Sequence, residues 1–208
     1  MKLEQYNKLL DSGIIIEDMT TTFIKGSNNI AKGVKILANT ILKDCDISEG
    51  CVIGPNSFLL NINLGPNSVV KFSYLEDSGV GKSCSIGPFS HLKSKSKISD
   101  NVSIGNYVEI KNSSIGEGTK INHHAYIGDA EVGLRVNIGA GSITCNYDGN
   151  KKHKTFIGND VFIGAGTMLI APLRLGDNSK TGAGSVVTKN VEDNITVVGN
   201  PAKILDNA

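Results

Sequence analysis

The chain has 208 residues and a net charge of +1, with 24 glycines and no tryptophan. It has no apolar run long enough to cross a bilayer and no basic stripe, which argues against a membrane protein and against a nucleic-acid partner. Nothing resembles a signal peptide, and the four cysteines lack the spacing of a zinc site or a disulfide framework. We therefore expect a cytoplasmic protein without a metal site.

The first residues predict a short helix. Apolar side chains recur near helical spacing over the first ten positions, and the segment ends at Asp11-Ser12-Gly13. We expect residues 1–13 to form a helix that caps the rest of the chain, and residues 14–208 to form one domain.

A six-residue repeat dominates the chain that follows. An aliphatic residue followed by glycine returns at intervals of six or near multiples of six, from Ile53-Gly54 to Leu175-Gly176. Four places after the aliphatic stands a small or β-branched residue: Ser57, Ser68, Val102, Val108, Thr119, Ala125, Val136, Ser142, Val161, Thr167, Ser179 and Ser185. Hexads of this kind predict an all-β fold, a left-handed parallel β-helix of about ten triangular coils. The first and fifth positions should point inward and the sixth outward.

The phase of the hexads after Ile104 places several polar residues on the outside. Five-residue units at 110–114 and 127–131 interrupt the repeat one coil apart. In this frame His123 lies one coil above Asn106 and one below Ala140, and Glu109 and Tyr126 lie on a neighbouring outward row. An exposed histidine among such groups is a candidate general base, because neutral imidazole accepts a proton near pH 7.

The repeat breaks at residues 144–155 and resumes at Ile157-Gly158. We expect this segment to be a loop ejected from the helix, and such loops commonly carry function. Its asparagine, tyrosine and lysine residues suit an anion or a sugar. The alternative is a solvated basic loop without a ligand.

Three stretches, 104–113, 126–130 and 136–149, resemble the C-terminal acetyltransferase half of the GlmU family, bifunctional N-acetylglucosamine-1-phosphate uridyltransferases and glucosamine-1-phosphate acetyltransferases. The similarity is strongest over residues 86–183, and a weaker similarity reaches back to residues 13–18. No glycine-rich nucleotide-binding loop precedes the repeats, so uridylyl transfer is not predicted.

The resemblance implies acetyl-CoA-dependent N-acetylation of an amino sugar phosphate, with glucosamine-1-phosphate as the leading acceptor, in cell-envelope precursor synthesis. It implies that His123 is the base, that Glu109 orients it, and that the backbone NH of Ala140 stabilises the thioester oxyanion. It implies further contacts with the sugar phosphate and the reacting centre from Lys93, Lys111, Tyr126, Lys152, Asn137, Asn146 and Tyr147, and an acetyl-CoA channel along Ala140, Ala165 and Ala183. It also implies a homotrimer with its sites between subunits. Whether a separate uridyltransferase is a further partner is left open by the sequence.

Three departures from the family leave alternatives open. Lys93 stands where the family has an arginine on the substrate phosphate, Ala165 where a serine is common, and Asn200 near an expected arginine. The same chemistry could serve another acceptor, such as a nucleotide-linked amino sugar or a sugar hydroxyl. A catalytically silent β-helix that serves as an assembly subunit is the other alternative, although a scaffold would not need His123, Glu109 and the loop.

Overall fold

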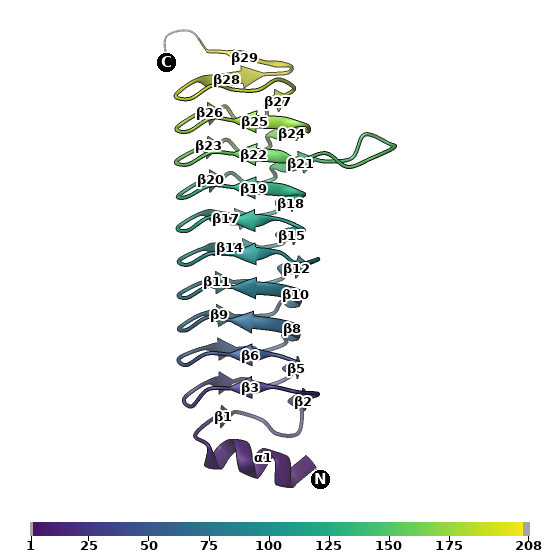
Figure 1. Ribbon diagram of the computed structural model, residues 1–208, viewed down its shortest axis with the longest axis vertical. Helices are drawn as coiled ribbons and strands as arrows, with labels where there is room; N and C mark the ends of the chain where they lie inside the picture. The colour runs from purple at the N-terminus through teal and green to yellow at the C-terminus, as the bar shows by residue number, and fades with distance from the viewer. Residues whose placement is uncertain (1, 206–208) are drawn as a thin grey trace.

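The computed structural model describes residues 2–205, and it is an elongated parallel β-helix with one α-helix at its N-terminal end (Figure 1). Three strand-bearing faces, here called A, B and C, follow one another around each coil. Face A is a twelve-stranded sheet in which only the last pairing is antiparallel. Its remaining strands mark eleven coils, against the ten expected, and at about 4.8 Å per coil the stack is roughly 50 Å long.

The strands are short because each spans one side of a triangle. Face A holds β1 (Ile15–Ile16), β4 (Lys35–Ile36), β7 (Val52–Ile53), β9 (Val69–Val70), β11 (Ser85–Ile86), β14 (Ser103–Asn106), β17 (Lys120–His123), β20 (Asn137–Ile138), β23 (Phe162–Ile163), β26 (Lys180–Thr181), β28 (Thr196–Gly199) and β29 (Ala202–Ile204). Face B holds β2 (Phe23–Lys25), β5 (Ile41–Lys43), β12 (His91–Lys93), β15 (Glu109–Lys111), β18 (Tyr126–Gly128), β21 (Ile143–Cys145), β24 (Met168–Ile170) and β27 (Val186–Val187). Face C holds β3 (Asn29–Ile30), β6 (Asp46–Ile47), β13 (Lys97–Ile98), β16 (Ser114–Ile115), β19 (Ala130–Val132), β22 (Thr155–Ile157) and β25 (Leu173–Leu175). Two longer strands, β8 (Phe58–Leu64) and β10 (Tyr74–Val80), bend around the corner from face B to face C.

The core is the column that the hexads predict. All twelve small or β-branched residues at the fifth position are buried, and the aliphatic residues at the first position stack above and below their equivalents. Burying one such aliphatic side chain stabilises the fold by about 1.5–3 kcal/mol. Cys51 and Cys84 belong to this column, and burial raises the pKa of both thiols. The inward rows therefore follow directly from the sequence period.

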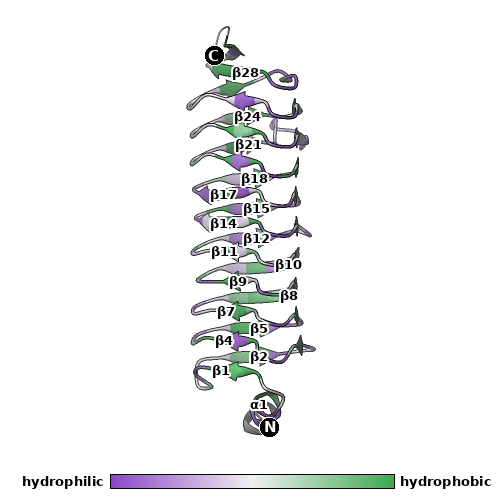
Figure 2. Ribbon diagram, turned by 90° about the vertical axis from the view of Figure 1, so that its left-hand side faces the viewer, coloured by the Kyte–Doolittle hydropathy of each residue, from purple (hydrophilic) through white to green (hydrophobic). Residues whose placement is uncertain are grey.

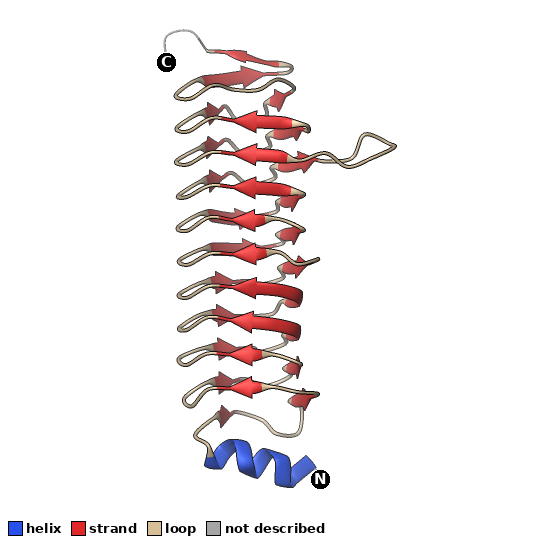
Figure 3. Ribbon diagram, in the orientation of Figure 1, coloured by secondary structure: helices blue, strands red, loops and turns tan. Residues whose placement is uncertain are grey.

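The N-terminal helix α1 (Lys2–Asp11) covers the open end of the first coils (Figure 1). Tyr6 is 2% exposed, its hydroxyl donates to the carbonyl of Thr22 at 2.7 Å, and Leu9 packs on the core. Figure 3 shows that this helix and the segment that leaves the stack between β21 and β22 are the conspicuous departures from a regular coil. Within residues 2–205 no helix is long and apolar enough to cross a membrane.

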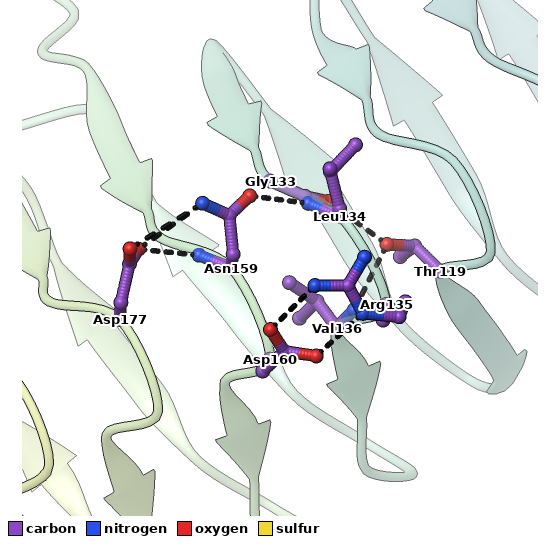
Figure 4. A network of polar contacts seen from close by, with 8 residues as sticks. All are labelled: Thr119, Gly133, Leu134, Arg135, Val136, Asn159, Asp160 and Asp177. Carbon is purple, nitrogen blue, oxygen red and sulfur yellow. Dashed lines mark hydrogen bonds and ion pairs between the residues drawn. The ribbon is translucent and has the colours of Figure 1, made fainter.

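The corner between faces C and A shows how neighbouring coils are fixed in register (Figure 4). The side-chain oxygen of Asn159 accepts a hydrogen bond from the backbone N–H of Leu134 at 2.9 Å, and Asp177 accepts one from the N–H of Asn159 at 2.7 Å. Arg135 donates two 2.7 Å hydrogen bonds to Asp160, which hold the pKa of that carboxyl below its usual value. At this corner a side chain of each coil thus hydrogen-bonds to the backbone of the coil before it. These bonds fix the register of neighbouring coils.

Candidate active site

His123 lies at the end of β17, at the corner between faces A and B, and is exposed. The pairing of β14 with β17 sets it directly above Asn106, as the hexad frame predicts. Its Nδ1 is 2.9 Å from the side-chain oxygen of Asn106. Because an amide oxygen can only accept, this contact requires a proton on Nδ1, and in the neutral ring Nε2 is then the atom with the lone pair. The ring is therefore held in the tautomer that can act as a base.

Ala140 lies one coil above His123. The pairing of Lys120 with Asn137 and of Ile121 with Ile138 continues to this corner, and the N–H of Gly141 donates to the carbonyl of His123 at 3.2 Å. In the described part of the chain, the backbone N–H groups of Ala140, Ala165 and Ala183 donate to no other backbone group. All three residues are exposed, so three free amide donors stand above one another at the corner that carries His123.

These amides have the chemistry that an acetyl-CoA channel requires. The extended pantetheine arm of CoA carries carbonyl and amide groups. To bind these groups, the protein needs backbone N–H donors that its own hydrogen bonds do not already use. The glycines that follow each of these residues leave the corner without side chains. A Cβ at Gly141 would meet only the backbone of Gly166, at 3.8 Å, and a Cβ at Gly184 would meet nothing within 4 Å, so this part of the corner is open. The residues at this corner therefore fit an acyl thioester.

A second group of site residues lies on face B. Lys93 and Glu109 form an ion pair at 2.8 Å, Lys111 lies directly above Lys93, and Tyr126 lies directly above Glu109. All four side chains are half-buried. The row positions of Glu109 and Tyr126 agree with the frame read from the hexads, and the cluster combines two cations and one carboxylate in two neighbouring coils.

The structure gives Glu109 a partner other than the expected one. Within residues 2–205 no hydrogen bond joins its carboxylate to His123; the carboxylate binds Lys93, and Asn106 holds the imidazole. The two side chains lie on different sides of the corner, because Glu109 begins a strand of face B whereas His123 ends a strand of face A. Orientation of His123 by Glu109 therefore stays a prediction. Within one chain the residue that contacts the imidazole is Asn106.

Tyr126 lies flat along face B because the next outward position is a glycine. A Cβ on Gly128 would meet the tyrosine hydroxyl, so no larger residue fits beneath the ring without moving it. The amide nitrogen of Asn146 is 3.5 Å from the same hydroxyl. Asn146 itself is 7% exposed and donates its amide to Asp129 at 2.5 Å. Its side chain thus holds other protein groups, whereas the resemblance placed it at the reacting centre.

The ejected loop is a small hairpin that projects from the stack between β21 and β22 (Figure 1). Tyr147 and Lys152 pair as an antiparallel bridge, and both are exposed. At the tip Asp148 accepts hydrogen bonds from the N–H groups of Asn150 and Lys151, both at 2.8 Å, and from His153 at 2.6 Å. These donors, first the N–H of Lys151 and then His153, hold the pKa of the Asp148 carboxyl well below its usual range. The hairpin is therefore ordered by its own contacts.

One chain does not bring all the expected residues together. Asn137 lies on face A at the start of β20, three residues before Ala140, and Lys152 lies on the projecting hairpin. Two residues at the site were missed as contributors: Asn106, whose partnership with His123 needs a side-chain contact, and Asp129, which binds Asn146. The hexad frame already placed Asn106 under His123, so the signal for the first was present.

The histidines do not converge on a metal. Within the described residues no group of three His, Cys, Asp or Glu side chains has the geometry of a metal site. His91 lies 3.4 Å from Glu76, His124 packs on the ring of Tyr107, and His153 binds Asp148.

The chain is similar to known proteins over most of its length. The profile of a family described as GMPPB C-terminal domain matches residues 74–207. The chain is 44% identical over 195 residues to the bifunctional protein GlmU of Acinetobacter baylyi, covering 93% of this chain and 43% of that protein. It is 43% identical over 187 residues to GlmU of Nitrosospira multiformis, covering 89% and 41%. The chain thus spans about two fifths of the length of these relatives.

Among solved structures, serine acetyltransferase (CysE) of Neisseria gonorrhoeae is 35% identical with a TM-score of 0.43, covering 48% of this chain and 40% of that one.

Proposed function

The chain belongs to the family of the GMPPB C-terminal domain and is similar to GlmU over nine tenths of its length, and from this premise we propose that it is an acetyl-CoA-dependent sugar N-acetyltransferase. The proposed acceptor is an amino sugar phosphate, glucosamine-1-phosphate first, and the product would be N-acetylglucosamine-1-phosphate. One observation carries the proposal: His123, held by Asn106 with Nε2 free, lies one coil below the unpaired N–H of Ala140.

These two groups can perform the two halves of an acetyl transfer. The amine of the sugar attacks the carbonyl carbon of the thioester, and Nε2 of His123 takes the proton that the amine loses. The oxyanion that forms on the former carbonyl accepts a hydrogen bond from the N–H of Ala140. Collapse of the tetrahedral intermediate breaks the C–S bond and expels the CoA thiolate, which takes the proton from the imidazolium. General base catalysis contributes about 10²- to 10⁴-fold, and one oxyanion donor about 10²- to 10³-fold.

The acceptor's phosphate would bind the cations of face B and the hairpin. Lys111 has no ion-pair partner in the described part of the chain, and Lys152 is exposed on the hairpin. Lys93 forms an ion pair with Glu109 at 2.8 Å, so a phosphate must compete with that carboxylate for the Lys93 ammonium. An ammonium is also a point charge without the planar pair of donors of an arginine. Lys111 should therefore make the larger contribution to phosphate affinity.

We further propose that the active unit is a homotrimer with its sites between subunits. Face B has two outward rows, and the row that holds Tyr126 is apolar below the site, at Phe23, Phe58 and Tyr74, and again above it, at Met168. The other row carries Lys25 and Lys43 in the lower coils. On this face Figure 2 shows the lower part of the contrast: β5 and β8 are green, whereas β12, higher along the helix, is tinged purple. A second copy on this face would cover the apolar stretches and bring its own groups to the charged band between them.

The pairing of Lys93 with Glu109 favours one alternative, the same transfer to an acceptor without a free phosphate monoester. The test is the release of CoA from acetyl-CoA with glucosamine-1-phosphate, free glucosamine and UDP-linked amino sugars, with His123→Ala as the blank. Release that depends on His123 and is fastest with glucosamine-1-phosphate supports the proposal. Release with another acceptor alone would replace glucosamine-1-phosphate as the proposed substrate. Release with none of the acceptors would refute the proposed acetyltransferase activity.

A further inference from the structure

The hairpin leaves the helix at one defined point. Asp129 and Ala130 are adjacent in the coil below, but the residues above them are Asn146 and Thr155. Residues 147–154 are thus inserted between two positions that would otherwise be consecutive, at the corner between faces B and C. The orientation of the hairpin, with the exposed Tyr147 and Lys152 on it, depends on how this junction is fixed.

Asp129 holds both ends of the junction. Its Oδ2 accepts from the side-chain amide of Asn146 at 2.5 Å, at the start of the hairpin, and its backbone carbonyl accepts from the N–H of Thr155 at 3.2 Å, at the end. Its Oδ1 accepts from the side-chain amide of Asn112 at 2.5 Å, one coil below. The side chain is only 8% exposed, so a carboxylate is withdrawn from water to make these bonds.

We propose that Asp129 is a positioning residue that anchors the hairpin and so sets where Tyr147 and Lys152 meet the acceptor. The sugar-binding part of this inference rests on the proposed function, whereas the anchoring part does not. A carboxylate is the acceptor that this junction requires, because both facing side chains present amide N–H groups and bonds to a charged acceptor are the strong ones.

The same corner supplies a matched control. Asp77 also accepts a side-chain amide from the coil below, from Asn61 at 2.8 Å, and its carbonyl accepts the N–H of Lys95 at 2.8 Å. No segment leaves the helix above Asp77. Asp77→Asn therefore tests what the loss of such a carboxylate does to a plain coil.

The experiment measures the native hairpin directly and the enzyme separately. The first readout is the rate of trypsin cleavage after Lys151 and Lys152 in the folded protein, and the second is KM against kcat for glucosamine-1-phosphate. Asp129→Asn removes the charge from both side-chain bonds, and the bond to Asn146 persists only if that amide turns to present its oxygen. The double variant Asp129→Asn with Asn146→Asp exchanges donor and acceptor across the junction, and the amide oxygen at position 129 still accepts from Asn112.

We expect Asp129→Asn to raise the cleavage rate about tenfold and KM by a similar factor with a smaller change in kcat, since a hydrogen bond to a charged group is worth about that factor or more. The double variant should bring the cleavage rate back to within about threefold of that of the unaltered protein, and Asp77→Asn should change neither the cleavage rate nor KM. KM is compared only between the unaltered protein, Asp129→Asn and Asp77→Asn, because the resemblance places Asn146 itself near the acceptor. Unchanged cleavage in Asp129→Asn, or cleavage that stays fast in a folded double variant, would overturn the anchor.

Three outcomes separate the anchoring part of the proposal from the sugar-binding part. If Asp129→Asn does not fold, the double variant decides alone, because it retains both side-chain bonds: slow cleavage supports the anchor and fast cleavage overturns it. If no acceptor releases CoA, the proposed function fails while the cleavage rates still test the anchor. If cleavage responds as expected and KM does not, the hairpin is anchored by Asp129 but does not bind the acceptor, and the positioning role is wrong.

Discussion

The contact between Asn106 and His123 gives the sharpest test of the site. Asn106→Ala removes the acceptor that lies 2.9 Å from Nδ1, and the imidazole is then free to rotate and to exchange tautomers. A hydrogen bond of this kind contributes about 0.5–1.5 kcal/mol, which corresponds to about 2- to 13-fold in rate. We therefore expect kcat to fall by that factor, with little change in KM for acetyl-CoA.

Asn106→Asp tests the direction of the same effect. A carboxylate in this position favours the protonated imidazole, so the acid limb of the pH profile of kcat/KM should move to higher pH. At about 4 Å two unit charges interact by about 1 kcal/mol in water and more near a protein surface, so a shift of about one pH unit is expected. At pH 9, where the ring of the variant is neutral again, most of the activity should return.

The assay is CoA release across pH 5.5–9.5 for the unaltered protein and both variants. The control is Asn101→Ala, which removes a side-chain amide that donates to Glu117 at 3.0 Å, also one coil away but at the corner between faces C and A. A kcat in Asn106→Ala equal to that of the control, together with an unmoved profile in Asn106→Asp, would show that this hydrogen bond does not prepare His123.

Three further predictions concern the base, the phosphate and the hairpin tip. His123→Ala should lower kcat by about 10²-fold or more at unchanged thermal stability, since the side chain is exposed; near-normal turnover would exclude it as the base. Lys111→Ala should raise KM for glucosamine-1-phosphate and leave free glucosamine unaffected, and an equal effect on both would argue against a phosphate contact. The pKa of Asp148 is depressed in the folded hairpin, so its stabilising bonds are fully present above the unfolded value of about 3.9 and are lost as the pH falls through the folded value. Hydrogen-exchange protection of the Asn150 and Lys151 amides should accordingly persist at pH 5 and decline below pH 4; protection that is independent of pH would refute the role of the carboxylate.

The sequence predicts the interior of this molecule better than its surface contacts. A period of six fixes which side chains point inward, and counting coils placed His123 above Asn106 and Tyr126 above Glu109, as the strand pairing confirms. The same counting cannot choose among rotamers. The partner of Glu109 is Lys93 because two long side chains in adjacent coils of one face reach each other, and periodicity does not encode that choice.

The anchor of the hairpin escaped the sequence for a related reason. Asp129 is the middle residue of the five-residue unit 127–131, at a corner where its φ is +50°, and aspartate is a common residue in that conformation. A corner aspartate is thus explained locally without any partner. Its function depends on Asn146, which is distant in sequence and stacks on it only because the chain leaves the helix after that residue.

The corner between faces A and B agrees with the proposed height of the site along the helix. Successive coils place Phe72, Phe89, Tyr107 and His124 there, all with positive φ, a conformation that is costly for bulky residues. Their rings lie 4.8–5.9 Å apart, and each such contact returns about 0.5–1.5 kcal/mol toward that cost.

One coil above His124 the corner residue becomes Gly141, and glycines continue at Gly166 and Gly184. Side chains therefore cover the corner up to the coil of His123, and bare backbone follows from the coil of Ala140. A base must come from a side chain, whereas an oxyanion donor is best supplied by an uncovered amide. The boundary between the aromatic and the glycine parts of this corner is the place where one coil spacing separates the proposed base, His123, from the proposed oxyanion donor, the N–H of Ala140.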